Sequence, residues 1–197
     1  MYLRIRIIFL GAYILTFSNI YSQNIEQRNR NSIEIGLGVA GAETLFYGLY
    51  GKYSLPLSQM KHHFTFGLAL NVFNDFKGES TNESFLKNDV DMRIIPSLNF
   101  GYSLNFKRFQ LNLELPVGAS VAITQGTLVN RRIGFERDYS NKEIFWYYGL
   151  SFLPKYRIDN NNQIGLFLFM PLASDKTQSG YQVGIGWTRK IGTKAGK

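Results

Sequence analysis

His62 and His63 are the side chains best suited to acid–base or metal chemistry, and they are the only histidines in the chain. They stand side by side after Lys61, and neighbouring side chains on a strand point to opposite faces, which does not suit a shared metal ion. The chain has no cysteine, so disulfides and thiolate metal sites are excluded. We therefore expect no metal, no cofactor and no catalytic residue, and we place both histidines at a turn.

Three glycines, Gly36, Gly38 and Gly41, match the dinucleotide-binding pattern G-x-G-x-x-G. That pattern binds a pyrophosphate only where a strand precedes it, a helix begins at it and an acidic residue follows about 20 positions later. The residues around it do not predict these surroundings. We interpret the glycines as small residues on the crowded face of a strand.

Three arginines, Arg131, Arg132 and Arg137, lie in the long polar stretch 124–142. The planar guanidinium group of arginine binds phosphate oxygens through two donors at once. These arginines are candidate contacts for the phosphates of an anionic partner, and a simply solvated loop is the alternative. The other basic residues are dispersed without a nucleic-acid-binding motif, so the net charge of +8 does not indicate a nucleic acid partner.

The first 22 residues have the three-part layout of a secretory signal peptide. Arg4 and Arg6 precede the apolar run 7–17, and a small, polar tail leads to Ser22. This run is well short of the roughly 20 residues that span a bilayer as a helix. We expect cleavage after Ser22, which leaves one domain, residues 23–197, with a net charge of +6. A retained N-terminal helix is the alternative.

The remaining chain is organised by apolar and polar residues that alternate with a period of two, which is typical of β-strands with one apolar face. In the first such segment, Ile33, Ile35 and Leu37 alternate with Glu34 and Gly36. One segment, the seventh, is apolar on both faces, so its orientation stays open. The sequence predicts eight strands, at 33–40, 45–55, 64–72, 92–104, 109–118, 144–157, 163–172 and 181–188.

Short and long connections alternate between these segments. The tight polar turns 105–108 and 159–162 are typical of hairpins, whereas 74–91, 124–142 and 174–180 are longer polar stretches. This alternation predicts an antiparallel up-and-down meander with turns at one end and loops at the other. Because proline cannot donate a ladder hydrogen bond, bulges or strand ends are expected at four positions. They are Pro96, Pro116, Pro154 and Pro171.

The two faces of the predicted strands differ in bulk. One carries large aliphatic and aromatic residues, and the other carries small, polar and charged residues. A narrow barrel lumen accommodates only the second set, so Leu68, Leu111 and Leu150 are expected to point outward into an apolar solvent. Lipid is that solvent for a transmembrane barrel, whose closure also satisfies the backbone hydrogen bonds. A soluble lipid-binding barrel, with the apolar face turned inward, is the alternative.

Over residues 32–191 this pattern resembles the small eight-stranded outer-membrane β-barrels of Gram-negative bacteria, the OmpA-like and porin-like families. The resemblance implies an all-β, eight-stranded antiparallel up-and-down transmembrane β-barrel in the outer membrane. It also implies outer-membrane lipid and lipopolysaccharide as partners, with the barrel assembly machinery acting during biogenesis. Aromatic residues near the predicted strand ends would form the interfacial girdles of such a barrel. They are Tyr53, Phe64, Phe106, Phe109, Tyr156, Tyr181 and Trp187.

Charged residues also fall on the inward face of the predicted strands, where an eight-stranded barrel is only just wide enough for its own side chains. They are Glu34, Lys52, Arg93, Glu114, Lys155 and Arg157. We expect a lumen polar cluster that includes Arg93, Asn99 and Glu114, in which opposite charges pair rather than line a water path. Phe167 and Phe169 would add to the closure if they face inward.

These expectations lead to a functional prediction without a named ligand. The protein is predicted to have a structural or interaction role through its outer loops, with a closed lumen. A small pore for ions or small solutes is the alternative. A lipid A-modifying enzyme ranks third, because hydrolysis needs a general base and both histidines are expected at the opposite, inner end.

Overall fold

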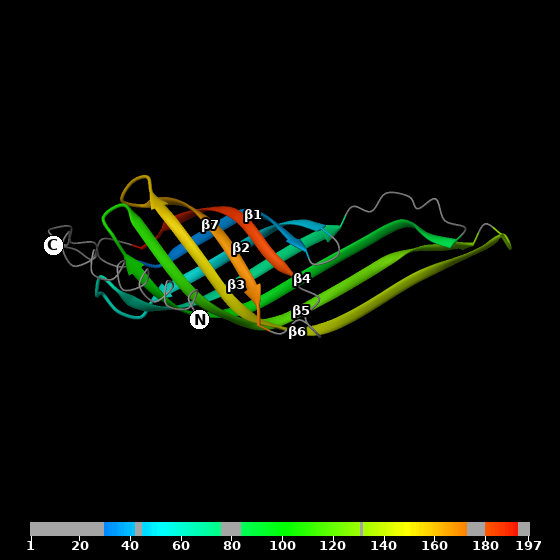
Figure 1. Ribbon diagram of the computed structural model, residues 1–197, viewed down its shortest axis with the longest axis horizontal. Helices are drawn as coiled ribbons and strands as arrows, with labels where there is room; N and C mark the ends of the chain where they lie inside the picture. The colour runs from blue at the N-terminus through cyan, green and yellow to red at the C-terminus, as the bar shows by residue number, and fades with distance from the viewer. Residues whose placement is uncertain (1–29, 42–44, 76–83, 131, 173–179, 193–197) are drawn as a thin grey trace, which may run out of the picture.

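The computed structural model describes residues 30–41, 45–75, 84–130, 132–172 and 180–192. These residues form a closed barrel of eight antiparallel strands paired in sequence order, with β8 pairing back to β1 (Figure 1). The prediction of an all-β, eight-stranded up-and-down barrel is confirmed, while the predicted signal peptide, residues 1–22, lies outside the described residues. No helix in the described ranges is long and apolar enough to cross a membrane. The strands are β1 (Ser32–Gly41), β2 (Leu45–Pro56), β3 (His63–Asp75), β4 (Ser84–Asn105), β5 (Phe109–Asn130), β6 (Phe135–Arg157), β7 (Asn162–Pro171) and β8 (Tyr181–Lys190).

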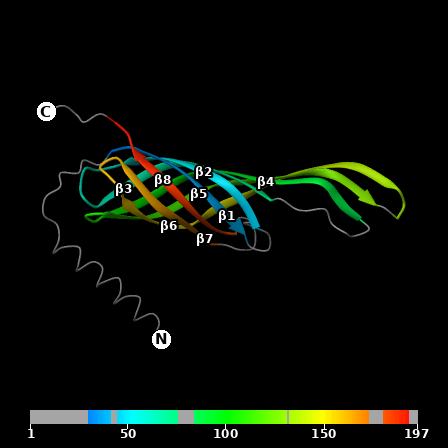
Figure 2. The same cartoon turned by 90° about the horizontal axis from the view of Figure 1, so that it is seen from above.

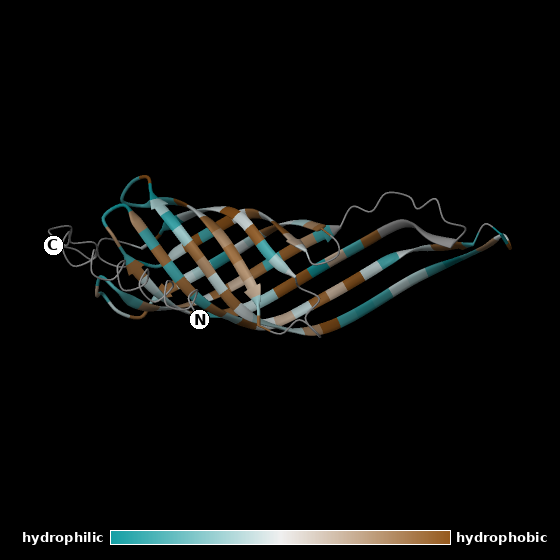
Figure 3. Cartoon of the chain, in the orientation of Figure 1, coloured by the Kyte–Doolittle hydropathy of each residue, from teal (hydrophilic) through white to brown (hydrophobic). Residues whose placement is uncertain are grey.

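Bulky apolar side chains point outward from the barrel wall. Leu68 is 52% exposed, Leu150 is 43% exposed and Leu111 is partly exposed. Figure 3 shows the alternation as successive brown and pale or teal bands along the strands. The predicted orientation of the two faces is therefore confirmed, and the alternative of an inward-facing apolar surface is wrong.

Glycines on the inward face make room for large side chains in the lumen. Gly36 of β1 and Gly186 of β8 lie against the side chain of Tyr50, and a Cβ atom at either position would collide with it. Gly36, Gly38 and Gly41 all lie within β1 and no helix begins at them. This placement agrees with the interpretation of the G-x-G-x-x-G pattern as a feature of a strand.

Three tight turns close one end of the barrel, which we call the turn end. They comprise residues 57–62, 106–108 and 158–161, and two of them are the hairpin turns predicted from the sequence. His62 lies in the first turn, as expected, whereas His63 is already the first residue of β3.

Strands β4, β5 and β6 project beyond the barrel at the opposite end, as two views of the molecule show (Figure 1 and Figure 2). They are 22, 22 and 23 residues long, against 10–13 residues for the other strands. We call residues 84–91 of β4, 124–130 of β5 and 135–141 of β6 the projecting sheet.

The projecting sheet corrects two of the predicted loops. Much of the stretches 74–91 and 124–142 is strand, and the β5–β6 ladder continues without a break to the pair Asn130↔Phe135. Threonine, valine and tyrosine recur in these segments and favour strands, although polar residues separate them. The third predicted loop, 174–180, lies outside the described residues except for its last residue.

Three of the four prolines lie inside strands without a bulge, contrary to expectation. The register is the same on either side of Pro96, of Pro116 and of Pro154. Each proline removes one donor, which interrupts the ladder locally but inserts no extra residue. Pro171 ends β7, as expected. The β4–β5 register shifts instead near the start of β4.

Candidate functional site

Aromatic side chains fill the middle of the lumen. The ring of Tyr147 stacks on Phe169 with centroids 4.6 Å apart, and Tyr50 stacks on Phe167 at 5.1 Å. Phe167 and Phe169 are 9% and 2% exposed, so both face inward, and the open orientation of β7 is resolved. We call this cluster the aromatic layer. Its other buried members are Ala40, Phe46, Phe73, Ile95 and Leu153.

Most of the aromatic layer was not predicted from the sequence, because the inward face was expected to carry small and polar residues. A signal was nevertheless present in the strand register. Tyr50 stands directly across from Gly36, and Phe73 stands across from Gly48. A large residue paired with a glycine on the neighbouring strand therefore indicates an inward-facing side chain in this barrel.

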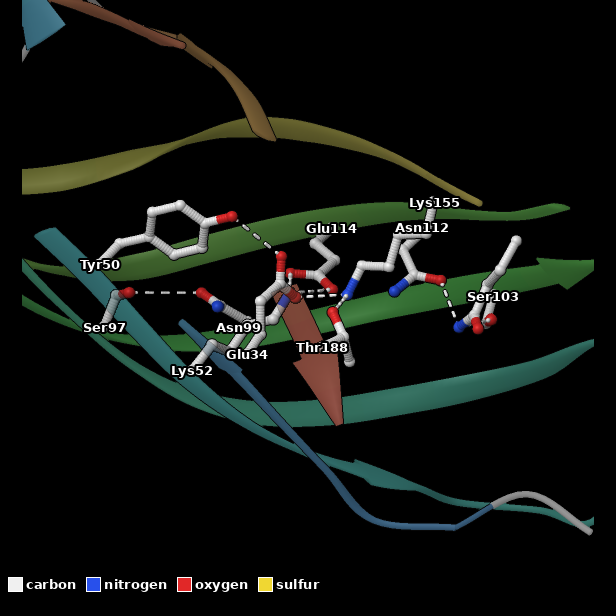
Figure 4. Close-up of polar contacts among 11 residues, drawn as sticks. Glu34, Tyr50, Lys52, Ser97, Asn99, Ser103, Asn112, Glu114, Lys155 and Thr188 are labelled. Carbon is white, nitrogen blue, oxygen red and sulfur yellow. Dashed lines mark hydrogen bonds and ion pairs between the residues drawn. The ribbon is translucent and has the colours of Figure 1, made fainter. Parts of the chain in front are cut away.

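Four charged side chains form a buried network (Figure 4). It lies on the turn-end side of the aromatic layer, because Lys155 follows Leu153 of that layer towards the end of β6. Glu34 is central, and its carboxylate accepts hydrogen bonds from Lys155 and, at 3.1 Å, from the hydroxyl of Tyr50. Lys52 lies 3.4 Å from the same carboxylate and donates to both oxygens of Glu114, at 2.9 and 3.1 Å. Two carboxylates face two ammonium groups, so this buried network is formally neutral.

Together the two layers occlude the lumen over the part of the chain that the structure describes. A buried charge is stable only when its remaining donors are satisfied, and Lys155 has a second acceptor in the hydroxyl of Thr188, 3.0 Å away. The cavity left between the layers has a volume of about 10 Å³. This is space for no more than one water molecule.

The three residues of the predicted lumen polar cluster occupy two different levels. Asn99 and Glu114 line the same small cavity, and Glu114 is paired with Lys52. Arg93 precedes Asn99 by six residues on β4, so the two residues lie roughly 20 Å apart at the usual rise of a strand. Its guanidinium group lies over the ring of Phe46, 4.1 Å from the centroid. The sequence identified Glu34, Lys52 and Lys155 as inward-facing but not their pairing. Glu34 and Lys52 are directly opposite each other on β1 and β2, whereas the contacts of Lys52 with Glu114 and of Lys155 with Glu34 cross the lumen.

The two histidines lie at the turn end with amide and basic neighbours. His62 accepts a hydrogen bond from the backbone N–H of Asn105 at 3.3 Å. Burial and the nearby charge of Lys61 lower the pKa of His62. Among the described residues, no group of three or more histidine and carboxylate side chains is arranged to hold a metal ion.

Side-chain polarity reverses where the projecting sheet leaves the barrel. Within the barrel the outward positions of β6 are apolar, as at Ile144 and Trp146, whereas the next outward positions are Lys142 and Ser140. The same reversal occurs on β5, where Ile123 pairs with Lys142 and marks the same level. This level is where the outer surface changes from apolar to polar.

The inner face of the projecting sheet shows the opposite change. Phe135, Arg137 and Tyr139 lie at inward positions of β6, and Leu128 pairs with Arg137 from β5. All four side chains are exposed. Tyrosine and arginine are the residue types enriched at the energetic centres of protein interfaces. The inner face of the projecting sheet is therefore the candidate interaction surface.

The predicted phosphate contacts lie near the tip of this sheet. Arg132 is exposed in the β5–β6 turn, where its backbone N–H donates to the side chain of Asn130 at 3.1 Å. Arg137 is exposed five residues later, and Arg131 lies outside the described residues. The acids Glu136 and Asp138 alternate with Arg137, so they project from the opposite face.

A closed eight-stranded antiparallel barrel with an apolar outer surface and a filled interior is the architecture of a small transmembrane β-barrel. Solved structures share this fold. The chain is similar to Ail, the attachment invasion locus protein of Yersinia pestis, with a TM-score of 0.53 and 13% sequence identity over 83% of this chain and 99% of that one.

The same Yersinia protein in complex with the heparin analogue sucrose octasulfate matches with a TM-score of 0.50, at the same identity and coverage. The N-terminal β-barrel domain of Pseudomonas aeruginosa OprF matches with a TM-score of 0.41 and 16% identity, over 82% of this chain and 98% of that domain. No protein-family model and no curated protein sequence matches the chain. At 13% identity, the similarity to Ail shows the fold alone.

Proposed function

We propose that this chain is an outer-membrane protein of a Gram-negative bacterium, exported with residues 1–22 as a cleaved signal peptide. Residues 23–197 would then be assembled by the barrel assembly machinery and surrounded by outer-membrane lipid. The exposed apolar side chains of the barrel wall support this proposal, because an aqueous surface does not favour an apolar band of this extent. The projecting sheet would face the cell exterior and the turn end would face the periplasm.

The proposed role is interaction with a partner outside the cell through the inner face of the projecting sheet. One observation carries this proposal: side-chain polarity reverses at Ile123 and Ile144, so the exposed aromatic residues move from the lipid-facing side to the other face of the sheet. A sheet that only extended the barrel into water would have no physical reason to carry Phe135, Arg137 and Tyr139 on one exposed face.

The partner proposed is an anionic saccharide, bound by Arg131, Arg132 and Arg137. Arg137 lies seven residues beyond Ile144, roughly 23 Å along the strand, so it would reach saccharide chains above the lipid surface. Phosphorylated lipopolysaccharide is the nearest such polymer in an outer membrane. Sucrose octasulfate, which is bound in a solved structure of Ail, is a suitable probe for testing this proposal.

The test is calorimetric titration of sucrose octasulfate into the mature chain, held in phosphatidylcholine nanodiscs. Charge-assisted contacts are worth about 1.5–3 kcal/mol each, so replacing Arg132 and Arg137 together by glutamine is expected to weaken binding at least about tenfold. The matched control replaces Lys107 and Arg108, an equal charge change at the turn end. If the two double variants bind sucrose octasulfate with equal affinity, the projecting sheet is not the binding surface.

The alternatives of a small pore and a lipid A-modifying enzyme have less support. A pore needs a water path through the lumen, which the aromatic layer and the buried network fill in the described part of the chain. An enzyme needs an acid–base group beside a substrate site, and both histidines lie at the turn end, far from the projecting sheet.

A further inference from the structure

A small recess opens into the lumen at the turn end, on the far side of the buried network from the aromatic layer. Its volume is about 30 Å³, enough for about two water molecules. Ser54, His63 and Thr65 are among the residues that line it. Lys155 lines its floor, where the ammonium group is already paired with Glu34.

Positive charge is concentrated around this recess. Arg30, two residues before β1, and Lys190, the last residue of β8, line it, and none of the described residues that line it is acidic. Arg157, the last residue of β6, is not part of the lining but stands directly across from Gln163, which is. Two cations that are not paired with Glu34, namely Arg30 and Lys190, therefore line the recess and Arg157 lies beside it, without a carboxylate among the described lining residues, whereas the neighbouring buried network is balanced.

Arg157 has hydrogen-bonding capacity that this part of the structure does not use. Its Nη1 atom donates to the backbone carbonyl of Lys107 at 3.0 Å. Its Nε and Nη2 atoms are buried and have no hydrogen-bond partner among the described residues. Buried donors without acceptors are unfavourable, and an oxyanion beside them would supply acceptors and charge at the same time.

We propose that this recess binds a phosphate group, carried either by free inorganic phosphate or by the headgroup of a lipid. A phosphate dianion matches the surplus of cations better than a carboxylate, which has one charge. The size of the recess admits a single oxyanion and excludes a bulky polyanion such as sucrose octasulfate. The site is at the opposite end from the projecting sheet and does not depend on the function proposed for it.

The experiment titrates inorganic phosphate into the mature chain in phosphatidylcholine nanodiscs, by isothermal calorimetry in a chloride-poor buffer. Saturable binding is expected for the unmodified chain. Each of the variants Lys190→Gln and Arg157→Gln is expected to bind about tenfold more weakly, as befits one lost charge-assisted contact. Lys107→Gln is the matched control, because it removes one charge at the same end but outside the recess, and a change of less than about twofold is expected.

Two outcomes would overturn the proposal: no saturable binding by the unmodified chain, or equal weakening in Lys107→Gln and Lys190→Gln. Phosphate is also expected to raise the midpoint of thermal unfolding of the unmodified chain, since a ligand that binds only the folded state stabilises it. That rise should be absent in Lys190→Gln. This second measurement keeps the test decisive if Arg157→Gln fails to assemble.

Changing the lipid of the nanodisc distinguishes the two sources of phosphate, free inorganic phosphate and a lipid headgroup. In nanodiscs that contain phosphatidic acid, whose headgroup is a phosphate monoester, a reachable headgroup would compete and suppress the titration by inorganic phosphate. Undiminished titration in those nanodiscs would assign the recess to free phosphate in the periplasm.

Discussion

Glu34 is the residue on which the buried network depends most. Its carboxylate contacts both lysines of the network and the hydroxyl of Tyr50, whereas Glu114 contacts Lys52. Replacing one partner of a buried ion pair leaves a charge without compensation in a medium of low dielectric constant. The two carboxylates are therefore not equivalent, although both are buried and both lie in the lumen.

We expect Glu34→Gln to lower the free energy of unfolding by about 3 kcal/mol, and Glu114→Gln to lower it by less. The reason is that Lys52 keeps a carboxylate partner in the second variant. Urea unfolding of the mature chain in phosphatidylcholine vesicles measures both values. Glu143→Gln, at an exposed position of β6, is the control. Equal losses in the two lumen variants would contradict the central position of Glu34.

Asp159, in an exposed turn, is the residue for which a pH dependence is expected. Hydrogen bonds from the side chain of Asn162 and from the backbone N–H groups of Asn161 and Asn162 hold the pKa of Asp159 below its usual value. Because the folded-state pKa is depressed, this turn contributes stability that is present above the unfolded pKa of about 3.9 and is lost as pH falls through the folded value.

A carboxyl NMR titration of the chain in micelles measures the pKa of Asp159 directly. Asn162→Ala is expected to raise this pKa towards its usual value. Asn160→Ala, in the same turn, removes none of the three hydrogen bonds and should leave it in place. A pKa that does not respond to Asn162→Ala would show that these hydrogen bonds do not stabilise the carboxylate.

At the level of the strands, the lumen is built from large residues that pack against glycines of neighbouring strands. The fit between Gly186 and the hydroxyl group of Tyr50 is the tightest, and it joins β8 to β2 across the intervening β1. This fit gives the barrel a specific interior rather than a loosely filled one, because overpacking by a single methyl group forces backbone or rotamer shifts.

Gly186→Ala is therefore expected to destabilise the barrel by about 1–3 kcal/mol. Tyr50→Phe should relieve part of this loss, because the hydroxyl oxygen is the atom nearest to the added methyl group. Gly51→Ala is the matched control, since a Cβ atom there meets no atom within 4 Å. Urea unfolding of the single and double variants gives the coupling energy, and additive effects would refute the contact.

The strands also show which structural information a linear pattern contains. Alternation identified all eight strands because outward residues such as Leu68 and Leu150 are uniformly apolar. It did not identify the projecting sheet, because alternation of apolar and polar residues weakens where both faces of a sheet meet water. It also misassigned Pro96, Pro116 and Pro154, since a lost donor interrupts a ladder without changing its register.

Across the whole molecule, the axis is divided into regions with different chemistry. The projecting sheet exposes aromatic and basic residues, the aromatic layer and the buried network close the lumen, and the recess concentrates positive charge at the turn end. The contacts of Lys52 with Glu114 and of Lys155 with Glu34 could not be read from the sequence, because they cross the lumen between strands that are not neighbours and join residues 62 and 121 positions apart. The charge signs and inward positions of these residues could be predicted, and these partners could not.

Two barriers in series predict that the barrel does not conduct. An ion would have to displace stacked aromatic rings at Phe167 and Phe169 and then break ion pairs at Glu34, and each step carries a separate penalty. We expect no steady unitary current from the mature chain in planar bilayers.

Phe169→Ala should carry no steady current either, because it opens only the aromatic layer and leaves the buried network intact. Glu34→Gln should not conduct either, because it disrupts only the buried network and leaves the aromatic layer intact. Current is therefore expected only when the two changes are combined. Steady openings of the unmodified chain would show that the packed side chains move apart on the timescale of conduction, and would favour the pore as its function.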